Sequence, residues 1–430
     1  IRAFQKTSFW KVLGDFSLDG KNTALSCEFR GKEESKYYRE SDLYKNMGFL
    51  QEEKAKTFQE IFQPYPREGI ITSLEKKKEV KNPPLLFNLA ELQNECAKIL
   101  KISPDDTLKL VQELYEKKLC TYPRTDARVL STAVSKEIEK NIRGLSVFPQ
   151  YLPFTKEILE RKSYSGIAKT KYCDDKKITD HYAIIPTGQG RSQYNSLGTL
   201  QKKVFDFIVR RFLSIFYPSA EYKKYNLSIA VLEEEFFASE KQLEKPGYLQ
   251  LYEKSIEKEE KEGNSENEED EENRVSGLSG LSGLKKGSKV YLMNTALKEG
   301  ETSPPKRYTS GTMILAMENA GKLIEDESLR EQIKGSGIGT SATRAGILTK
   351  LEKNEYIRLD KKNQQLSPSL LGEKIVQILW NSIPSLLNPT LTASWEKGLS
   401  YVEEGTIEEK EYMKKLEDFV RKNTEKVKSS

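Results

Sequence analysis

The sequence is short of the residue types on which several classes of protein depend. It has one histidine, His181, and four cysteines that stand far apart, Cys27, Cys96, Cys120 and Cys173. The cysteines form no Cys-x-x-Cys pair, so the sequence supports neither a disulfide framework nor a zinc ribbon. A single histidine cannot build a histidine-based metal site either.

Long apolar runs and nucleotide-binding motifs are missing as well. No segment approaches the ~20 apolar residues that a membrane helix needs, and no signal peptide is visible. No Gly-x-x-x-x-Gly-Lys-Ser/Thr motif for nucleotide phosphates occurs. The sequence therefore predicts a cytoplasmic protein that lies in no membrane and uses no nucleotide.

The acidic residues are concentrated in one segment. The net charge is only +5, but residues 253–272 hold eleven acidic residues and three lysines, a local charge of −8, which leaves +13 on the rest of the chain. A basic surface favours contact with phosphates through counterion release, although the same charge also serves ordinary solubility. Two candidate patches are Lys76 to Lys78 and Arg210 with Arg211, and each such patch is more often a solvated face.

What the sequence does contain is a tyrosine close to an arginine, in the run Thr-Tyr-Pro-Arg-Thr-Asp at residues 121–126. A phenol titrates near pH ~10, so it attacks phosphorus only where cationic or hydrogen-bonding neighbours stabilise the developing charge. Pro123 favours extended backbone at Tyr122, which would point Tyr122 and Arg124 to the same side, towards one phosphate. Asp126 could orient Arg124 or accept a backbone hydrogen bond. The alternative is a surface turn in which Tyr122 packs and Arg124 pairs with Asp126.

The residues before this run predict a helix. Ser103 is a capping residue, Pro104 suits the first helical position, and Asp105 and Asp106 suit the first turn. Apolar residues then recur at helical spacing, at Leu108, Val111, Leu114 and Tyr115. Tyr122 should therefore follow a helix, on a short extended segment.

Several ordered blocks of sequence resemble the type IA DNA topoisomerases. The Tyr-Pro-Arg form of the tyrosine run is most similar to the bacterial topoisomerase III branch. The blocks are residues 83–93 and 114–126 around the active-site tyrosine, 179–187 in the family's histidine motif, 337–347 in its glycine and threonine motif, and 308–322 and 391–399.

The resemblance implies an ATP-independent reaction and a set of residues for it. Tyr122 would become linked to a DNA 5′-phosphate while the strand end is held for passage and resealing. Arg124 would stabilise the phosphoryl transition state. His181 would contact a DNA phosphate or help a proton transfer, of which we favour the phosphate contact, and a structural histidine is the alternative. The residues implied in DNA binding are Arg124, Asp126, His181, Gly337, Gly339, Thr340, Thr343 and Arg344.

The sequence departs from the family pattern at several places. Ala127 stands where serine is common, which removes a hydroxyl contact, and Tyr182 stands where a second histidine or an acid is usual. Members of the family begin with a Toprim domain whose acids bind magnesium, but Ile1 resembles a position well past that domain, and no Asp-x-Asp-x-Glu constellation occurs. We therefore expect a fragment, without an initiating methionine or a metal site of its own and inactive alone, of an enzyme that uses Mg²⁺ when intact.

The family plan implies a multidomain α+β fold, with Toprim absent. Residues 1–81 and 217–302 are expected to form a strand-rich hinge, domain II, and residues 82–216 a helical domain III inserted between its halves. Residues 303–430 would be a portion of domain IV. A flexible insertion rich in acids and then in Gly, Ser and Leu is expected at about 253–287. Alternating apolar segments that predict strands lie at residues 9–13, 24–29, 225–231 and 289–292.

The C-terminal portion is typical of a winged-helix-like DNA-binding unit. Thr340 or Ser341 can cap a helix there, and Gly337 and Gly339 would let the backbone approach a phosphate at the helix start. Thr343 and Arg344 are the side chains expected to touch DNA, and a plain turn is the alternative. The expected elements are a helix over 342–353, a strand over 356–359, a hairpin turn over 361–364 and a helix over 370–380.

The predicted partner is DNA, preferably single-stranded, with RNA as a possible second substrate and with the protein acting as a monomer. One alternative is a non-catalytic module that binds single-stranded nucleic acid. The other is a type IB topoisomerase or tyrosine recombinase. Those enzymes link to a 3′-phosphate through a dispersed set of Arg, Lys and His, which a chain with one histidine fits poorly. The sequence does not distinguish decatenation from relaxation as the main activity.

Overall fold

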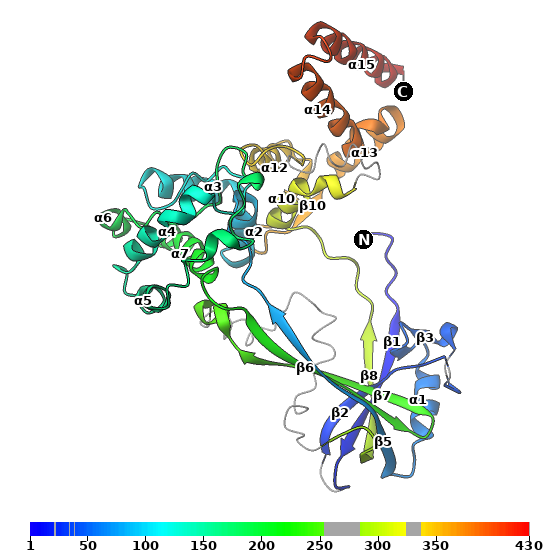
Figure 1. The fold of residues 1–430 in the computed structure, drawn as a ribbon. Helices are drawn as coiled ribbons and strands as arrows, with labels where there is room; N and C mark the ends of the chain where they lie inside the picture. Colours follow the sequence, from blue (N-terminus) through cyan, green and yellow to red (C-terminus); the bar gives the residue numbers. More distant parts are fainter. Residues whose placement is uncertain (21–22, 34, 38, 253–283, 324–336, 430) are drawn as a thin grey trace. The chain divides into compact units, whose positions relative to one another are not determined.

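Two groups of residues pack separately in the computed structural model, which describes residues 1–20, 23–33, 35–37, 39–252, 284–323 and 337–429 (Figure 1). The first unit joins Ile1–Pro83 to Pro218–Lys306, and the second joins Pro84–Tyr217 to Arg307–Ser430. The chain therefore passes from one unit to the other within a few residues of the boundaries expected from the sequence.

One difference from the expected division concerns the second unit. The helical stretch and the C-terminal stretch, which we expected as separate domains, pack into one unit. Their assignment to domains II, III and IV of the family remains a prediction. The insertion was expected at about 253–287, and residues 253–283 of it lie outside the described residues.

Strands build the first unit, and their pairings close into a ring. The strands pair in the order β2-β7-β6-β5-β8-β1, and β2 also pairs with β1, so the sheet closes on itself, while β4 and β3 continue from β1. Every pairing is antiparallel. The elements are β1 (Ser8–Ser17), β2 (Thr23–Phe29), β3 (Leu43–Tyr44), β4 (Gly48–Phe49), helix α1 (Glu52–Glu60), β5 (Arg67–Lys81), β6 (Ala220–Val231), β7 (Glu234–Lys245) and β8 (Lys289–Glu301).

Alternation of buried and exposed residues explains why these segments form a closed sheet. Val12 and Phe16 of β1 are fully buried, as are Phe29 of β2 and Phe236 of β7, and together they fill the interior. Phe58 of α1 joins them, with its ring centroid 4.2 Å from that of Phe29. β-branched and aromatic residues suit such a half-buried, pleated surface. The strands predicted from the sequence are confirmed.

The strands β5, β6 and β7 are longer than the ring requires. β8 pairs with β5 only from Arg67 to Ile70, whereas β5 pairs with β6 as far as Lys81. β2 pairs with β7 only at Phe236 and Phe237. The remaining halves of the three strands, residues 75–81, 220–226 and 239–245, form a three-stranded extension that we call the β5–β7 ribbon (Figure 1).

Helices build the second unit. The helix predicted before Tyr122 is confirmed: Ser103 caps α3 by accepting a hydrogen bond from the Asp106 amide at 3.1 Å. None of the helices among the described residues is long and apolar enough to cross a membrane. The elements are α2 (Leu89–Ile99), α3 (Pro104–Glu116), α4 (Thr132–Leu145), α5 (Leu152–Arg161), α6 (Arg191–Tyr194), α7 (Thr199–Ser214), α10 (Ser310–Glu318), α12 (Arg344–Lys353), β9 (Ile357–Leu359), β10 (Leu366–Pro368), α13 (Leu370–Ser382), α14 (Pro389–Glu403) and α15 (Glu409–Ser429).

Close packing of α10 on α2 joins the two stretches of the second unit. Gly311 makes this approach possible, because a side-chain Cβ there would lie only 2.7 Å from the Cα of Asn94. Ile314 of α10 is fully buried in a cluster with Ala90 of α2 and Leu348 of α12. The order helix, strand, hairpin turn and helix predicted for residues 342–380 is confirmed by α12, the β9–β10 hairpin and α13.

Candidate active site

Two extended segments bring the tyrosine run and the histidine motif together. The Thr121 amide donates to the Ile185 carbonyl at 2.9 Å, and the Ile185 amide donates back to the Thr121 hydroxyl at 3.0 Å. The Thr125 hydroxyl, in turn, donates to the carbonyl of His181 at 2.7 Å. These bonds fix Tyr122, between the two threonines, opposite the start of the histidine motif.

Tyr122 and His181 lie side by side as a result. Their ring centroids are 4.5 Å apart and their planes are inclined by 49°. Tyr115, at the end of α3, packs its ring edge-on against Tyr122 at 5.4 Å and 81°. Tyr122 is half-buried and His181 is exposed, so the phenol is supported by its neighbours while the imidazole remains open to a ligand.

Arg124 is exposed, and among the described residues it has no hydrogen bond or ion pair. The pair between Arg124 and Asp126 that a plain surface turn would favour is therefore not formed. The carboxylate of Asp126 faces another cation instead. Arg124 keeps its guanidinium donors for an external acceptor such as a phosphate.

Asp126 belongs to a buried polar network that also contains Arg344. Arg344 Nη1 donates to Asp126 Oδ1 at 2.8 Å and lies 3.9 Å from Glu318 Oε1. Asn88 Nδ2 donates to the Asp126 carbonyl at 3.1 Å and to Glu318 Oε1 at 2.6 Å. Burial raises the pKa of Glu318, Arg344 opposes that rise, and Asp126 adds to it. The network links the segment that carries Tyr122 to α2, α10 and α12.

The structure places Arg344 differently from the expectation that its side chain touches DNA. Its relative exposure is 1%, because it is the first residue of α12 and its side chain points inward to Asp126. In this conformation the guanidinium is enclosed by protein, so it holds Asp126 and is not presented to a ligand. Thr340 and Thr343, the other polar side chains expected there, are exposed.

The glycine and threonine motif forms a tight turn against the end of α10. Gly337 has φ +63°, and a Cβ on it would lie 2.4 Å from the Met317 carbonyl oxygen, so a side chain is excluded. Gly339 also has positive φ, +66°. The Ile338 amide donates to the same Met317 carbonyl at 2.8 Å. The turn is thus anchored beside Glu318.

The predicted cap of α12 is wrong. The helix begins at Arg344 and not at Ala342, and neither Thr340 nor Ser341 caps it. The reason is local: the Thr343 hydroxyl accepts a hydrogen bond from the Thr340 amide at 2.9 Å, which closes a turn before the helix. The exposed hydroxyl of Thr343 therefore lies just ahead of the helix start.

Comparisons with known proteins identify the family to which the chain belongs. The family model described as DNA topoisomerase matches residues 1–414. A protein named DNA topoisomerase 3 from Bacillus subtilis is 30% identical over 370 residues, which cover 85% of this chain and 48% of that protein. The chain belongs to the type IA DNA topoisomerases. Its resemblance to the topoisomerase III branch is confirmed.

Two further comparisons define the extent of the match. DNA topoisomerase 3 from Bacillus licheniformis is 30% identical over 368 residues, covering 84% of this chain and 47% of that protein. The solved structure of full-length topoisomerase I from Thermotoga maritima has a TM-score of 0.65 and 21% identity, covering 98% of this chain and 60% of that chain, and it supports the fold. The topoisomerase chain described here spans about half the length of the curated relatives that it matches.

The described part of this topoisomerase offers no cluster for a metal ion. No group of three or more His, Cys, Asp or Glu side chains comes together there. The residues described therefore do not fit the Mg²⁺ that the family implies. Cys120, two positions before Tyr122, is fully buried, and burial raises the pKa of its thiol, as expected of a small core residue.

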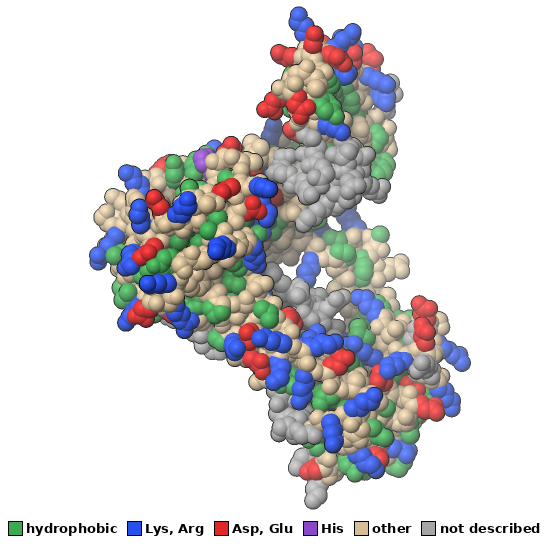
Figure 2. All heavy atoms as spheres, viewed as in Figure 1, with side chains coloured by type: hydrophobic (Ala, Val, Ile, Leu, Met, Phe, Trp, Pro, Cys, Tyr) green, Lys and Arg blue, Asp and Glu red, His purple; other side chains and the backbone are tan. Residues whose placement is uncertain are grey.

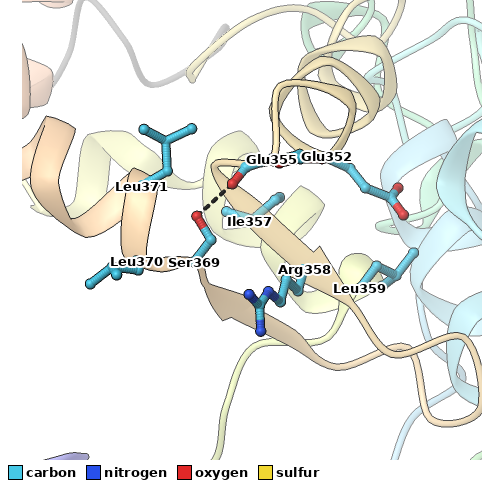
Figure 3. A pocket seen from close by; sticks show the side chains of 8 residues that line it. All are labelled: Glu352, Glu355, Ile357, Arg358, Leu359, Ser369, Leu370 and Leu371. Carbon is cyan, nitrogen blue, oxygen red and sulfur yellow. Dashed lines mark hydrogen bonds between the residues drawn. The ribbon is translucent and has the colours of Figure 1, made fainter.

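A pocket of about 450 Å³ lies elsewhere on the topoisomerase's second unit, between the end of α12, strand β9 and the start of α13 (Figure 3). Ser369 closes one side of it by donating its hydroxyl to the Glu355 carbonyl. Its lining residues are Glu352, Glu355, Ile357, Arg358, Leu359, Ser369, Leu370 and Leu371. Residues expected to bind DNA are absent from this lining.

Several residues of the site were missed by sequence reasoning. Thr125 and Tyr115 support the tyrosine and histidine directly, while Asn88 and Glu318 complete the network around Asp126. All four lie within the stretches that resemble the type IA topoisomerases, which is the signal that could have identified them. Tyr182, at the divergent position, is half-buried, and burial raises the pKa of its phenol.

Proposed function

We propose that Tyr122 is the nucleophile with which this type IA topoisomerase cleaves one DNA strand. The observation that carries the proposal is the packing of Tyr122 against His181, whose ring centroids lie 4.5 Å apart. Arg124, two residues after Tyr122, is exposed, and its guanidinium donors are available. A half-buried phenol with a cation and an imidazole at hand is the arrangement that phosphoryl transfer to tyrosine needs.

The proposed step is a transesterification. Tyr122 Oη forms a bond to phosphorus and loses its proton, the bond from phosphorus to the 3′ oxygen breaks, and that oxygen takes up a proton. The product is a 5′-phosphotyrosine and a free 3′ hydroxyl. Attack by that hydroxyl reverses the step, and because the ester conserves the bond energy, no nucleotide is consumed. Arg124 stabilises the charge on the phosphoryl oxygens, and His181 donates a hydrogen bond to a phosphate.

The wider reaction belongs to the same proposal. The full protein would pass a second strand through the break and reseal it, with Mg²⁺ held by a Toprim domain. We propose that the protein acts as a monomer in the cytoplasm. Its preferred substrate is single-stranded DNA, and RNA is a possible second substrate. Gly337, Gly339, Thr340 and Thr343 would contact the DNA backbone through amides and hydroxyls.

Trapping of a covalent adduct tests the proposal. The chain is incubated with a single-stranded oligonucleotide labelled at either end, alone and with an added Toprim fragment, then denatured with detergent and resolved on a gel. We expect the label on the 3′ side of the break to stay with the protein, because a 5′-phosphate linkage retains that part of the strand, and Tyr122→Phe to abolish the adduct.

The alternatives predict other outcomes. Retention of the label on the 5′ side would mean a 3′-phosphate link and a type IB or recombinase-like enzyme. Binding of the oligonucleotide without any adduct, even with the Toprim fragment, would mean a non-catalytic binding module. Either result would overturn the assignment of Tyr122.

A further inference from the structure

The register of the β5–β7 ribbon places three lysines in one row. Lys77 of β5 lies directly opposite Lys224 of β6, and Lys224 lies directly opposite Lys241 of β7. Residues paired across neighbouring strands share a face of the sheet, with their Cβ atoms about 5 Å apart. The row therefore sets like charges directly opposite one another twice, which is destabilising in an isolated sheet.

Protection of sheet edges does not account for this row. Lysines on exposed edges hinder pairing with other chains, and in the ribbon Lys77 and Lys241 lie on such outer strands. Lys224, however, lies on the central strand, whose two edges are both paired, so it protects no edge. Its charge must be explained in another way.

The ion pairs of the row are weakly held. Lys77 pairs with Glu75 at 2.6 Å, with the two side chains 66% and 52% exposed. Lys241 pairs with Glu79, and its ammonium also lies 4.4 Å over the ring of Tyr222. Lys224 has no ion pair among the described residues. Exposed pairs of this kind contribute only about 0–1 kcal/mol, so a phosphate can replace the carboxylates at little cost.

The opposite face of the same ribbon is different. There Lys78 and Lys245 both pair with Glu221, each at 3.0 Å, and Lys223 pairs with Glu244 at 3.2 Å. All three of these lysines thus have an ion pair, shared among two glutamates, whereas Lys224 of the row has none among the described residues. Figure 2 shows Lys and Arg side chains gathered along the region of the ribbon.

We propose that the row Lys77, Lys224 and Lys241 is a binding site for the phosphate backbone of a DNA strand, separate from the site around Tyr122. Strands lie about 4.8 Å apart, so the row spans roughly 10 Å, and successive phosphates of one strand advance by about 3.4 Å along a duplex axis. The row is therefore long enough to meet about three phosphates. The inference rests on DNA being the substrate, as proposed above, and not on Tyr122 being the nucleophile.

Two triple variants of the full chain test the site. One changes the row, Lys77→Gln, Lys224→Gln and Lys241→Gln. The matched control removes the same charge from the same strands on the opposite face, Lys78→Gln, Lys223→Gln and Lys245→Gln. Affinity for a fluorescent single-stranded oligonucleotide is measured by anisotropy over a series of salt concentrations.

We expect the row variant to bind at least about tenfold more weakly at low salt, with the slope of log K against log salt reduced by about 2, since each single-strand phosphate contact contributes about 0.7. The control should keep the wild-type slope. Equal losses in both variants, or none in the row variant, would refute the site and leave only an effect of net charge.

A stability measurement keeps the test valid if a triple variant folds poorly. Lys224→Gln alone relieves the repulsion within the row, so its thermal midpoint at low salt should equal or exceed that of the wild type while its affinity falls. A lower midpoint with unchanged affinity would mean that Lys224 serves the fold. Because the row does not include Tyr122, a wild-type chain that forms no adduct but still shows the row effect would mean failure of the proposed nucleophile and not of this site.

Discussion

Arg344 Nη1 donates to Asp126 Oδ1 at 2.8 Å, and this contact joins the first residue of α12 to the segment that carries Tyr122. Arg344 is almost fully enclosed, whereas the side chain of Asp126 is 33% exposed. The same guanidinium lies near Glu318, which Asn88 also holds. One buried arginine thus connects the glycine and threonine motif to the segment that carries Tyr122.

Replacement of Arg344 should therefore destabilise the second unit. Arg344→Ala leaves Asp126 and the buried Glu318 without their cation, and because Asp126 is partly exposed we expect a loss of about 2 kcal/mol in the free energy of unfolding, below the 3–5 kcal/mol of fully buried pairs. Urea unfolding measures it. The control is Arg143→Ala, which breaks the exposed helical pair with Glu139 and should change stability little. Equal effects of the two variants would contradict the buried network.

The pKa of Glu318 predicts a pH dependence of stability. Burial raises this pKa above the usual 4.5, so the folded state binds the proton more tightly than the unfolded state does. Stability from this group is then full below the unfolded pKa and falls as the pH rises through the folded pKa. Compared with Glu318→Gln, the wild type should lose relative stability as the pH rises above 4.5.

The measurement is the difference in free energy of unfolding between wild type and Glu318→Gln at several pH values. Taking this difference cancels the contributions of titratable groups that do not interact with Glu318. A wild type that gains relative stability as the pH rises would mean that Arg344 outweighs burial at this site.

Gly337 should tolerate no side chain. A Cβ would meet the backbone carbonyl oxygen of Met317 at 2.4 Å, and the positive φ adds strain, so Gly337→Ala should cost at least about 2 kcal/mol of stability. Gly346, on α12, is the matched control, because nothing lies within 4 Å of its Cβ position. Gly346→Ala should stabilise by about 0.5–1 kcal/mol through helix propensity. Thermal unfolding compares them, and a neutral Gly337→Ala would disprove the tight turn.

Arg124 should matter far more for cleavage than for binding. Its side chain is exposed, and in the proposed reaction it stabilises the transition state, so Arg124→Ala should lower the rate of adduct formation by about 10²–10³ while single-strand affinity falls much less. Arg124→Lys keeps the charge but loses the planar donors, so its rate of adduct formation should lie between those of the wild type and Arg124→Ala. Parallel losses of rate and affinity would show that Arg124 only anchors DNA.

The local features of this protein could be predicted from the sequence, and the long-range ones only in part. Ser103 and the residues after it specify the start of α3 through neighbouring backbone amides, so that prediction is confirmed. The predicted cap of α12 was wrong because Thr343, and not Thr340, supplies the hydroxyl that closes the turn before the helix. The proximity of Tyr122 and His181 depends on bonds from Thr121 and Thr125, and only the family resemblance indicated it.

Buried polar pairs and strand register could not be predicted from the sequence, because both depend on residues that are far apart along the chain. Arg344 and Asp126 are 218 positions apart, and nothing local distinguishes an arginine that will be enclosed from one on the surface. The lysine row depends on the register between β5, β6 and β7, and a shift of one residue would move Lys224 to the other face. Such relationships appear only once the chain is folded.

The most direct test of the central claim is mass spectrometry of the trapped adduct. After nuclease and trypsin digestion, the peptide of residues 119–124 should carry a nucleotide joined through its 5′-phosphate to Tyr122, and the Tyr122→Phe chain should carry none. A nucleotide on another residue, a link through a 3′-phosphate, or no modified peptide in the presence of the Toprim fragment would contradict the account.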